Sequence, residues 1–180
     1  MECLHDDESL RAMVLELRRR YEPCKVQGKP LKFLFRPPPG GIVGEFAIRD
    51  SCALVVVYHS PSSVRTSFQL FCTFTHELGH WCSWRDGTRT SEYEAAHSAY
   101  GAAVRDSDGS EEVMPAVPEA TRLIIFEEEV RAWTHGYLLA QEVGFIDAPA
   151  YETEALRGLA IYRQQLHISL EMRPITRICQ

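Results

Sequence analysis

The chain has 180 residues, of which 45% are hydrophobic and 24% are charged, and its formal net charge is −6. This composition is typical of a single globular domain and excludes a disordered or fibrous protein. The acidic balance argues against a general nucleic-acid binder, because such proteins usually carry a basic face.

The N-terminus and the cysteines point to a cytoplasmic protein. Residues Met1 to Glu8 are acidic and lack the apolar core of a secretory signal, and no stretch has the apolar length of a membrane span. The six cysteines include no Cys-x-x-Cys pair, so a zinc ribbon is not expected. We therefore expect reduced thiols and neither a membrane nor a nucleic-acid partner.

The first third of the chain predicts a helix followed by strands. Apolar residues recur at helical spacing over residues 8–22, and Pro23 ends the pattern. Three strand-like segments follow, at Leu31–Phe35, Gly44–Ile48 and Cys52–His59. A Pro- and Gly-rich loop is expected at 37–41, and the polar break at 49–51 predicts a hairpin. The strand at 52–59 fits either a central position or an edge that pairs with an extended peptide.

The rest of the chain predicts helices. A long helix from about Val64 to Trp84, capped by Ser62 or Ser63, is apolar on nearly every side and should be buried. Further helices are expected at Glu92–Val104, Pro118–Val143 and Ala150–Leu166, with a surface loop at 106–118. The sequence thus predicts an α+β fold in one domain spanning residues 1–180, with its core at about 30–145 and a C-terminal helix at 150–167.

The buried helix carries the sequence His76-Glu77-Leu78-Gly79-His80. Residues four apart lie one turn apart on the same helix face, so both imidazoles can bind one metal ion. Glu77 lies beside them and can take a proton from a metal-bound water without binding the ion. The alternative is a buried polar cluster satisfied by hydrogen bonds. Burial of these groups in an apolar helix favours Zn²⁺ on His76 and His80, with Glu77 as catalytic base.

Catalytic zinc takes three protein ligands, so a third ligand is needed. Position 86 is Asp86 rather than a third histidine, which favours a glutamate from another helix. Glu129 is preferred, because it shares a helix stripe with the small residues Ala132, Gly136 and Ala140, which permit close packing. Glu127 follows, and Glu128 comes last because it points away from the apolar face of its helix. Glu92 and Glu94 are rivals from the preceding helix.

Two supporting roles remain open in the sequence. Asp86 is either a carboxylate that orients a ligating histidine or a turn residue before Gly87. A group that stabilises an oxyanion is expected in such a site. None is singled out among Tyr93, His97, Tyr100, Arg122 and His135.

The motif and its setting resemble known peptidase families. The order of strand pair, turn, His76–His80 helix and glutamate helix is similar to gluzincin-type zincin peptidases. Val64 to His80, with Phe74-Thr75 before His76, resembles the ImmA/IrrE-like peptidases, and the segment ending in Ala132-Trp133 resembles zincin-like proteins of phages and prophages. The resemblance implies a small zincin-like domain, with a short, mostly antiparallel sheet packed on the motif helix and two or three further helices.

These features lead to one expected function and one alternative. The expected function is a zinc-dependent peptidase (a hydrolase) that cleaves a protein or peptide substrate, in line with the resemblance to peptidases that act on regulatory proteins. The alternative is a catalytically silent zinc-binding protein that acts by binding a partner. The sequence fixes neither the substrate nor the oligomeric state.

Overall fold

A computed structural model describes residues 4–37, 43–59, 65–106 and 117–168 of the chain. These residues form five helices and four strands: α1 (Asp7–Tyr21), β1 (Lys25–Val26), β2 (Lys29–Arg36), β3 (Gly44–Ile48), β4 (Ala53–Tyr58), α2 (Ser67–Arg85), α3 (Ser91–Asp106), α4 (Glu119–Glu142) and α5 (Ala148–Gln165). The expected α+β class is therefore confirmed.

The four strands form one small, mixed sheet in the order β1-β2-β4-β3. β1 pairs with β2, and β3 pairs with β4, in antiparallel fashion, whereas β2 and β4 run parallel. The predicted hairpin is present, with Ile48 opposite Ala53. β4 lies between β2 and β3, so the interpretation of residues 52–59 as an edge strand is wrong. Its run of buried apolar residues fits the central position.

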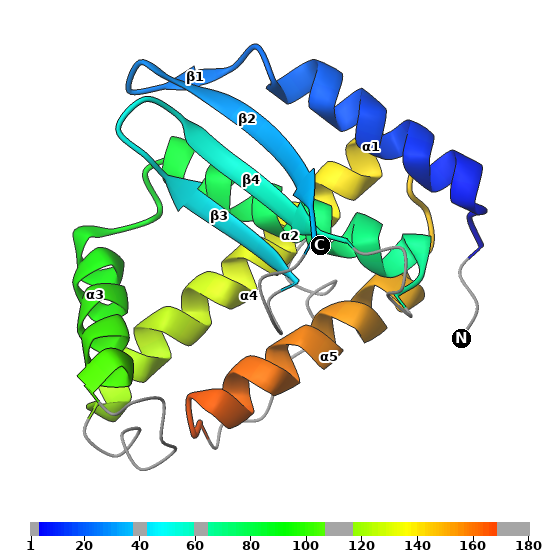
Figure 1. The fold of residues 1–180 in the computed structure, drawn as a ribbon. Coiled ribbons are helices and arrows are strands. Elements are labelled where there is room, and N and C mark those ends of the chain that lie inside the picture. Colours follow the sequence, from blue (N-terminus) through cyan, green and yellow to red (C-terminus); the bar gives the residue numbers. More distant parts are fainter. Residues whose placement is uncertain (1–3, 38–42, 60–64, 107–116, 169–180) are drawn as a thin grey trace.

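The helices lie mainly on one side of this sheet. In Figure 1, α2 lies behind the strands, and α4 and α5 lie below α2. α3 lies beside one end of α4. α2 packs on β3, β4, α1, α4 and α5, so it is the central element of the fold. All residues from Phe71 to Ser83 are buried, which confirms the predicted burial of this helix.

α2 begins later than the sequence suggested. Thr66 is its N-cap, and its hydroxyl accepts a hydrogen bond from the Gln69 amide at 3.2 Å. The Gln69 side chain in turn accepts from the Thr66 amide at 3.1 Å, which completes a capping box. The predicted cap at Ser62 or Ser63 is therefore wrong, because the reciprocal Thr66–Gln69 pair satisfies the first amides of the helix.

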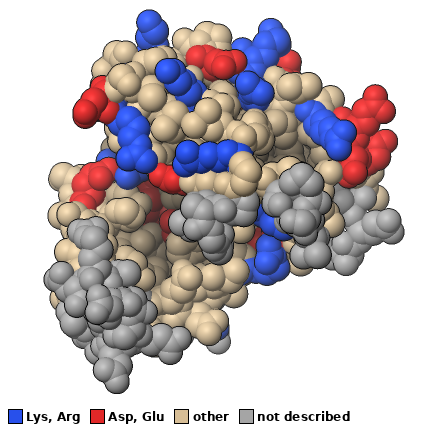
Figure 2. All heavy atoms as spheres, viewed as in Figure 1, with Lys and Arg blue, Asp and Glu red and all other residues tan. Residues whose placement is uncertain are grey.

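Several expected loops fall outside the described residues, among them most of the segments at 37–41 and 106–118. In the part of the chain that is described, no helix has both the length and the apolar character needed to cross a membrane. Figure 2 shows that basic side chains are more numerous on the upper half of the face seen in Figure 1, over the sheet and α1.

Candidate metal centre

The central helix α2 brings His76 and His80 together on one face. Their ring centroids lie 4.7 Å apart, as expected for residues separated by one helical turn. His76 also stacks on Trp133 of α4 at a centroid distance of 4.3 Å, which holds its ring against the neighbouring helix. Both imidazoles are buried, so their polar atoms need partners inside the protein.

Glu129 of α4 faces both imidazoles. Its Oε2 lies 3.3 Å from His76 Nε2 and 3.6 Å from His80 Nε2. Two ligand atoms on a tetrahedral zinc ion, each at 2.0–2.2 Å from it, are separated by about 3.3–3.6 Å. The three side chains thus have the spacing of a ligand set, and together they can hold a metal ion.

The carboxylate of Glu129 supports this interpretation. The residue is only 5% exposed, and its Oε2 is a buried atom with no hydrogen-bond partner among the described residues. A buried carboxylate oxygen that makes no well-aligned hydrogen bond, although two imidazole nitrogens lie near it, is costly. A cation bound between Oε2 and the two Nε2 atoms would remove that cost, so the donor set fits a metal.

The other candidate third ligands lie elsewhere. Glu127 is exposed on α4, and Glu92 and Glu94 are exposed on α3, where Glu94 pairs with Arg89 at 2.6 Å. None of them belongs to the cluster that the structure brings together among its described residues.

Glu128 corrects the sequence analysis, which placed it on the outer side of α4. It is 0% exposed, and its Oε1 lies 3.5 Å from His80 Nδ1. The error arose because α4 is covered by α3 as well as by α2, so that its buried arc is wider than one apolar stripe. Glu128 therefore contacts the opposite nitrogen of a candidate ligand.

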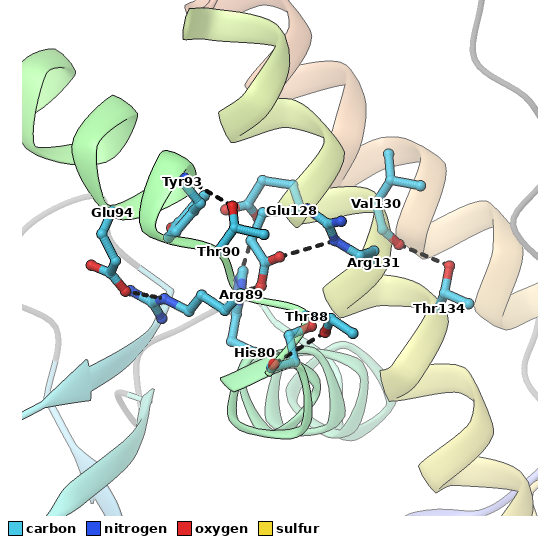
Figure 3. A network of polar contacts seen from close by, with 12 residues as sticks. His80, Thr88, Arg89, Thr90, Tyr93, Glu94, Glu128, Val130, Arg131 and Thr134 are labelled. Carbon is cyan, nitrogen blue, oxygen red and sulfur yellow. Dashed lines mark hydrogen bonds and ion pairs between the residues drawn. The ribbon is translucent and has the colours of Figure 1, made fainter. Parts of the chain in front are cut away.

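The second oxygen of Glu128 is also engaged. Oε2 accepts a hydrogen bond from Arg131 Nε at 3.1 Å, and Figure 3 shows this contact beside His80. Burial would raise the pKa of Glu128, but His80 and Arg131 outweigh it and lower the pKa. Glu128 is thus an ionised carboxylate suited to orient His80. Asp86 does not have this role, because it caps the C-terminus of α2 and pairs with Arg85.

Protonation of the two histidines differs. Burial lowers the pKa of His76, which favours the neutral imidazole that a metal requires. Burial also opposes the charge on His80, but the carboxylates of Glu129 and Glu128 outweigh it and raise its pKa. The pKa of Glu129 is lowered, because its attraction to His80 and His76 exceeds the effect of burial.

Glu77 is buried beside this cluster. Burial raises its pKa to about 8, with a further contribution from the charge of Glu129, while His80 acts in the opposite direction. β3 approaches Glu77 closely at Gly44, where a Cβ atom would lie 2.5 Å from Glu77 Oε1. A side chain at position 44 would therefore displace the Glu77 carboxylate, and glycine lets the strand pass close to it.

Two cavities meet at Glu77. The larger, of about 440 Å³, is bordered by His76, Trp133 and Arg157, and the smaller, of about 260 Å³, by His80 and Glu129. Gly44, Glu77 and Tyr162 line both, so a cleft passes over the cluster between β3 and α5.

Tyr162 of α5 is a further residue of the cleft, and no motif in the sequence points to it. The charge of Glu129, with burial, raises the pKa of Tyr162, so its hydroxyl remains protonated. The only signal in the sequence is that Gly158, Ile161, Tyr162 and Gln165 share one helix face, which lines the larger cavity. That spacing alone does not distinguish a site from a core.

Of the five candidates for an oxyanion stabiliser, the structure places two at the cleft and three elsewhere. Tyr93 and His97 line the smaller cavity. Arg122 donates to the carbonyls of Leu166 and His167 instead. Tyr100 and His135 line neither cavity among the described residues.

The chain was also compared with known proteins, once with protein-family models, once with curated proteins and once with solved structures. None of the three comparisons found a match, so the similarity to zincin peptidases stays an interpretation of the residues themselves.

Proposed function

We propose that the protein is a zinc-dependent peptidase in which His76, His80 and Glu129 bind the metal. The observation that carries the proposal is the convergence of two Nε2 atoms on Glu129 Oε2, 3.3 and 3.6 Å away, at the floor of a cleft that also contains Glu77. Zinc supplies a Lewis acid that activates water and polarises a carbonyl at neutral pH.

Glu77 acts as the general base and then as the general acid. Its carboxylate accepts a proton from the attacking water, and the protonated form donates it to the leaving amine. A pKa of about 8, raised by burial in the free protein, suits a group that has to both take up and release a proton near neutral pH.

Tyr162 stabilises the developing negative charge. Tyr162 lines the cleft from α5, on the side opposite β3, and its hydroxyl remains protonated because its pKa is raised. A neutral donor positioned at a developing oxyanion is a typical source of transition-state stabilisation.

β3 provides the surface for the substrate. It is an edge strand, and Gly44, Glu45 and Phe46 border the smaller cavity. An extended peptide can pair with such an edge through main-chain hydrogen bonds. In this proposal the peptide partner pairs with β3, one strand away from the segment that the sequence suggested.

The exchange Glu77→Gln tests the proposal. Purified protein should contain about one zinc ion per chain, measured by plasma mass spectrometry. A library of unstructured peptides, analysed for new termini by mass spectrometry, should show cleavage that a chelator abolishes. E77Q should retain zinc and lose cleavage by roughly 10²- to 10⁴-fold.

The control is Glu127→Gln, which changes an exposed glutamate on α4 in the same way. It should leave both zinc content and cleavage unchanged. If zinc-loaded wild-type protein and zinc-loaded E77Q gave the same cleavage pattern, the peptidase proposal would be refuted. A catalytically silent zinc-binding protein would then be favoured.

A further inference from the structure

A further cavity of about 470 Å³ lies between α1, the end of β2 and the beginning of α2, and it shares Arg65 with the larger cavity beside the metal centre. Its apolar wall is formed by the side chains of Leu10, Val14, Leu15, Phe35, Leu70 and Phe71. Leu15 is 61% exposed and Phe35 is 49% exposed, whereas Leu10 and Phe71 are buried. The cavity therefore has an apolar floor and an open mouth.

The polar part of this wall is basic. It comprises Arg11, Arg18, Arg65 and His59, together with Ser67, and no carboxylate is present among the described lining residues. The chain as a whole has 25 acidic and 19 basic residues, so a wall with arginines and no acid departs from its average surface. The charge of the cavity is complementary to an anion.

Arg18 has donors available for such an anion. Its guanidinium carbon lies 5.9 Å from the Phe33 ring centroid and 5.7 Å from that of Phe35, so aromatic rings rather than a carboxylate hold it. Its Nε is a buried atom without a hydrogen-bond partner among the described residues. The adjacent Arg19 and Arg20, in contrast, both pair with Glu16.

The beginning of α2 adds to the positive potential. Ser67 is the first residue of this 19-residue helix, and the first turn contains no acidic side chain. The N-terminal end of a helix dipole carries a partial positive charge that favours bound anions.

We propose that this cavity binds a small carboxylate with an unbranched apolar chain, such as a medium-chain fatty acid. The carboxylate binds Arg18 and Arg11, and the chain packs on Leu10, Leu70 and Phe71. The volume lies within the range of roughly 300–1,000 Å³ that small-molecule sites occupy. The site is distinct from the metal centre and goes beyond the proposed peptidase function.

A protein partner is disfavoured by the size of the exposed apolar surface. A stable protein interface buries about 800 Å² on each side. Among the apolar residues that line this cavity and that the structure describes, only Leu15 and Phe35 are strongly exposed. The rest of the apolar surface lies inside the cavity, where a flexible chain can reach it.

Titration calorimetry of the full chain with decanoate tests the proposal. One saturable site per chain is expected. Decyltrimethylammonium, which has the same chain and the opposite charge, and acetate, which has the same headgroup and no chain, should both bind at least about tenfold more weakly. Equal binding of either control, or no saturation by decanoate, would overturn the proposal.

Variants assign the binding to this cavity. Arg18→Gln should weaken decanoate binding by about tenfold or more. Arg11→Gln, at an exposed position, should weaken it as well and gives a second test if R18Q is unstable. The matched control is Arg19→Gln, which lies outside the cavity on the same helix and should bind as the wild type does. Unchanged binding by both R18Q and R11Q would refute the assignment.

Three further measurements address other occupants of the cavity and the relation to the peptidase proposal. An acidic amphipathic peptide that saturates the site while decanoate does not would overturn the proposal in favour of a protein partner. A dimer seen in sedimentation that Leu15→Ser abolishes would overturn it in favour of a second copy of the chain. E77Q should bind decanoate normally, so failure of the peptidase proposal is distinguishable from failure of this one.

Discussion

Glu128 and Glu129 are adjacent in the sequence and contact opposite sides of the same imidazole. Glu129 Oε2 faces His80 Nε2 at 3.6 Å, and Glu128 Oε1 faces His80 Nδ1 at 3.5 Å. Successive residues of a helix differ by about 100° around its axis, so one lies on each side of the ring. The pair fixes the ring orientation and gives the two carboxylates different roles, one as a candidate ligand and one as its support.

The supporting role of Glu128 leads to a prediction about metal affinity. Glu128→Gln should lower zinc affinity by about 10- to 100-fold, because the amide orients and polarises the imidazole less than a carboxylate does. Competition with a chromophoric chelator measures the change. Glu127→Gln, one residue earlier and exposed, is the matched control and should bind as the wild type does. Equal affinities for E128Q and wild type would show that the 3.5 Å contact has no such role.

Tyr162 gives a second prediction at this scale. Tyr162→Phe should lower kcat by about 10²-fold or more with a smaller effect on KM, since its hydroxyl acts on charge that develops in the transition state. Zinc content should not change. Tyr100→Phe, on the half-buried face of α3 and outside both cavities, is the control. A loss of zinc in Y162F would instead assign a structural role to the hydroxyl.

At the scale of elements, the distance between α2 and α4 determines the spacing of the cluster. The helices cross at Gly79 and Gly136, where each backbone lies directly against the other helix. A Cβ atom on Gly136 would lie 2.9 Å from the Thr75 carbonyl oxygen. A Cβ atom on Gly79 would overlap the carbonyl oxygen of Ala132. The predicted stripe of small residues on α4 thus contacts α2 directly, and this contact lets Glu129 reach both histidines.

Gly79→Ala tests this close packing. Alanine normally stabilises a helix interior relative to glycine by about 1 kcal/mol. Here the overlap with the Ala132 carbonyl makes alanine destabilising instead. We expect the free energy of unfolding to fall by about 1–3 kcal/mol, together with weaker zinc binding. Denaturant unfolding of the metal-free proteins measures the first effect. Glu127→Ala, on the exposed side of α4, should not destabilise, and a stabilised G79A would contradict the packing.

On the scale of the whole molecule, the cluster joins two helices that are separated in the sequence by α3. His76 and His80 lie on α2 and Glu129 lies on α4, and the spacing between their ligand atoms exists only in the folded chain. A metal that binds only this state stabilises it by mass action. Folding and metal binding should therefore be coupled.

Thermal unfolding tests this coupling. Zinc at 100 times its dissociation constant should add about 2.7 kcal/mol, which corresponds to a rise in Tm of roughly 5–10 °C for a domain of this size. Glu129→Gln should show a much smaller rise. No difference between zinc-loaded and chelator-treated wild type would refute the metal centre.

The same coupling has a pH dependence with a definite sign. The neighbouring carboxylates outweigh burial and raise the pKa of His80, so the metal-free protein holds a proton there that zinc must displace. The stabilisation by zinc should therefore grow as the pH rises from 6 towards the raised pKa. Calorimetry in buffers of different ionisation enthalpy should detect the released proton.

Much of the fold could be predicted from the chain because its signals are local. Helical spacing in residues 8–22 gave α1, observed at Asp7–Tyr21, and the polar break at 49–51 gave the β3–β4 hairpin. What the sequence left open or misplaced depended on neighbouring elements. Residues 52–59 were interpreted as either an edge or a central strand, because only the pairing with β2 distinguishes these positions.

The sequence by itself determined that His76 and His80 share one face of a buried helix with Glu77 beside them, because a spacing of four residues within a helix has the same geometry in any fold. Only the tertiary structure decided which glutamate completes the cluster, that Glu128 supports His80 and that Tyr162 lies across the cleft. These depend on how α4 is rotated about its axis and on where α5 packs. Such long-range contacts leave little trace in the local pattern of residues.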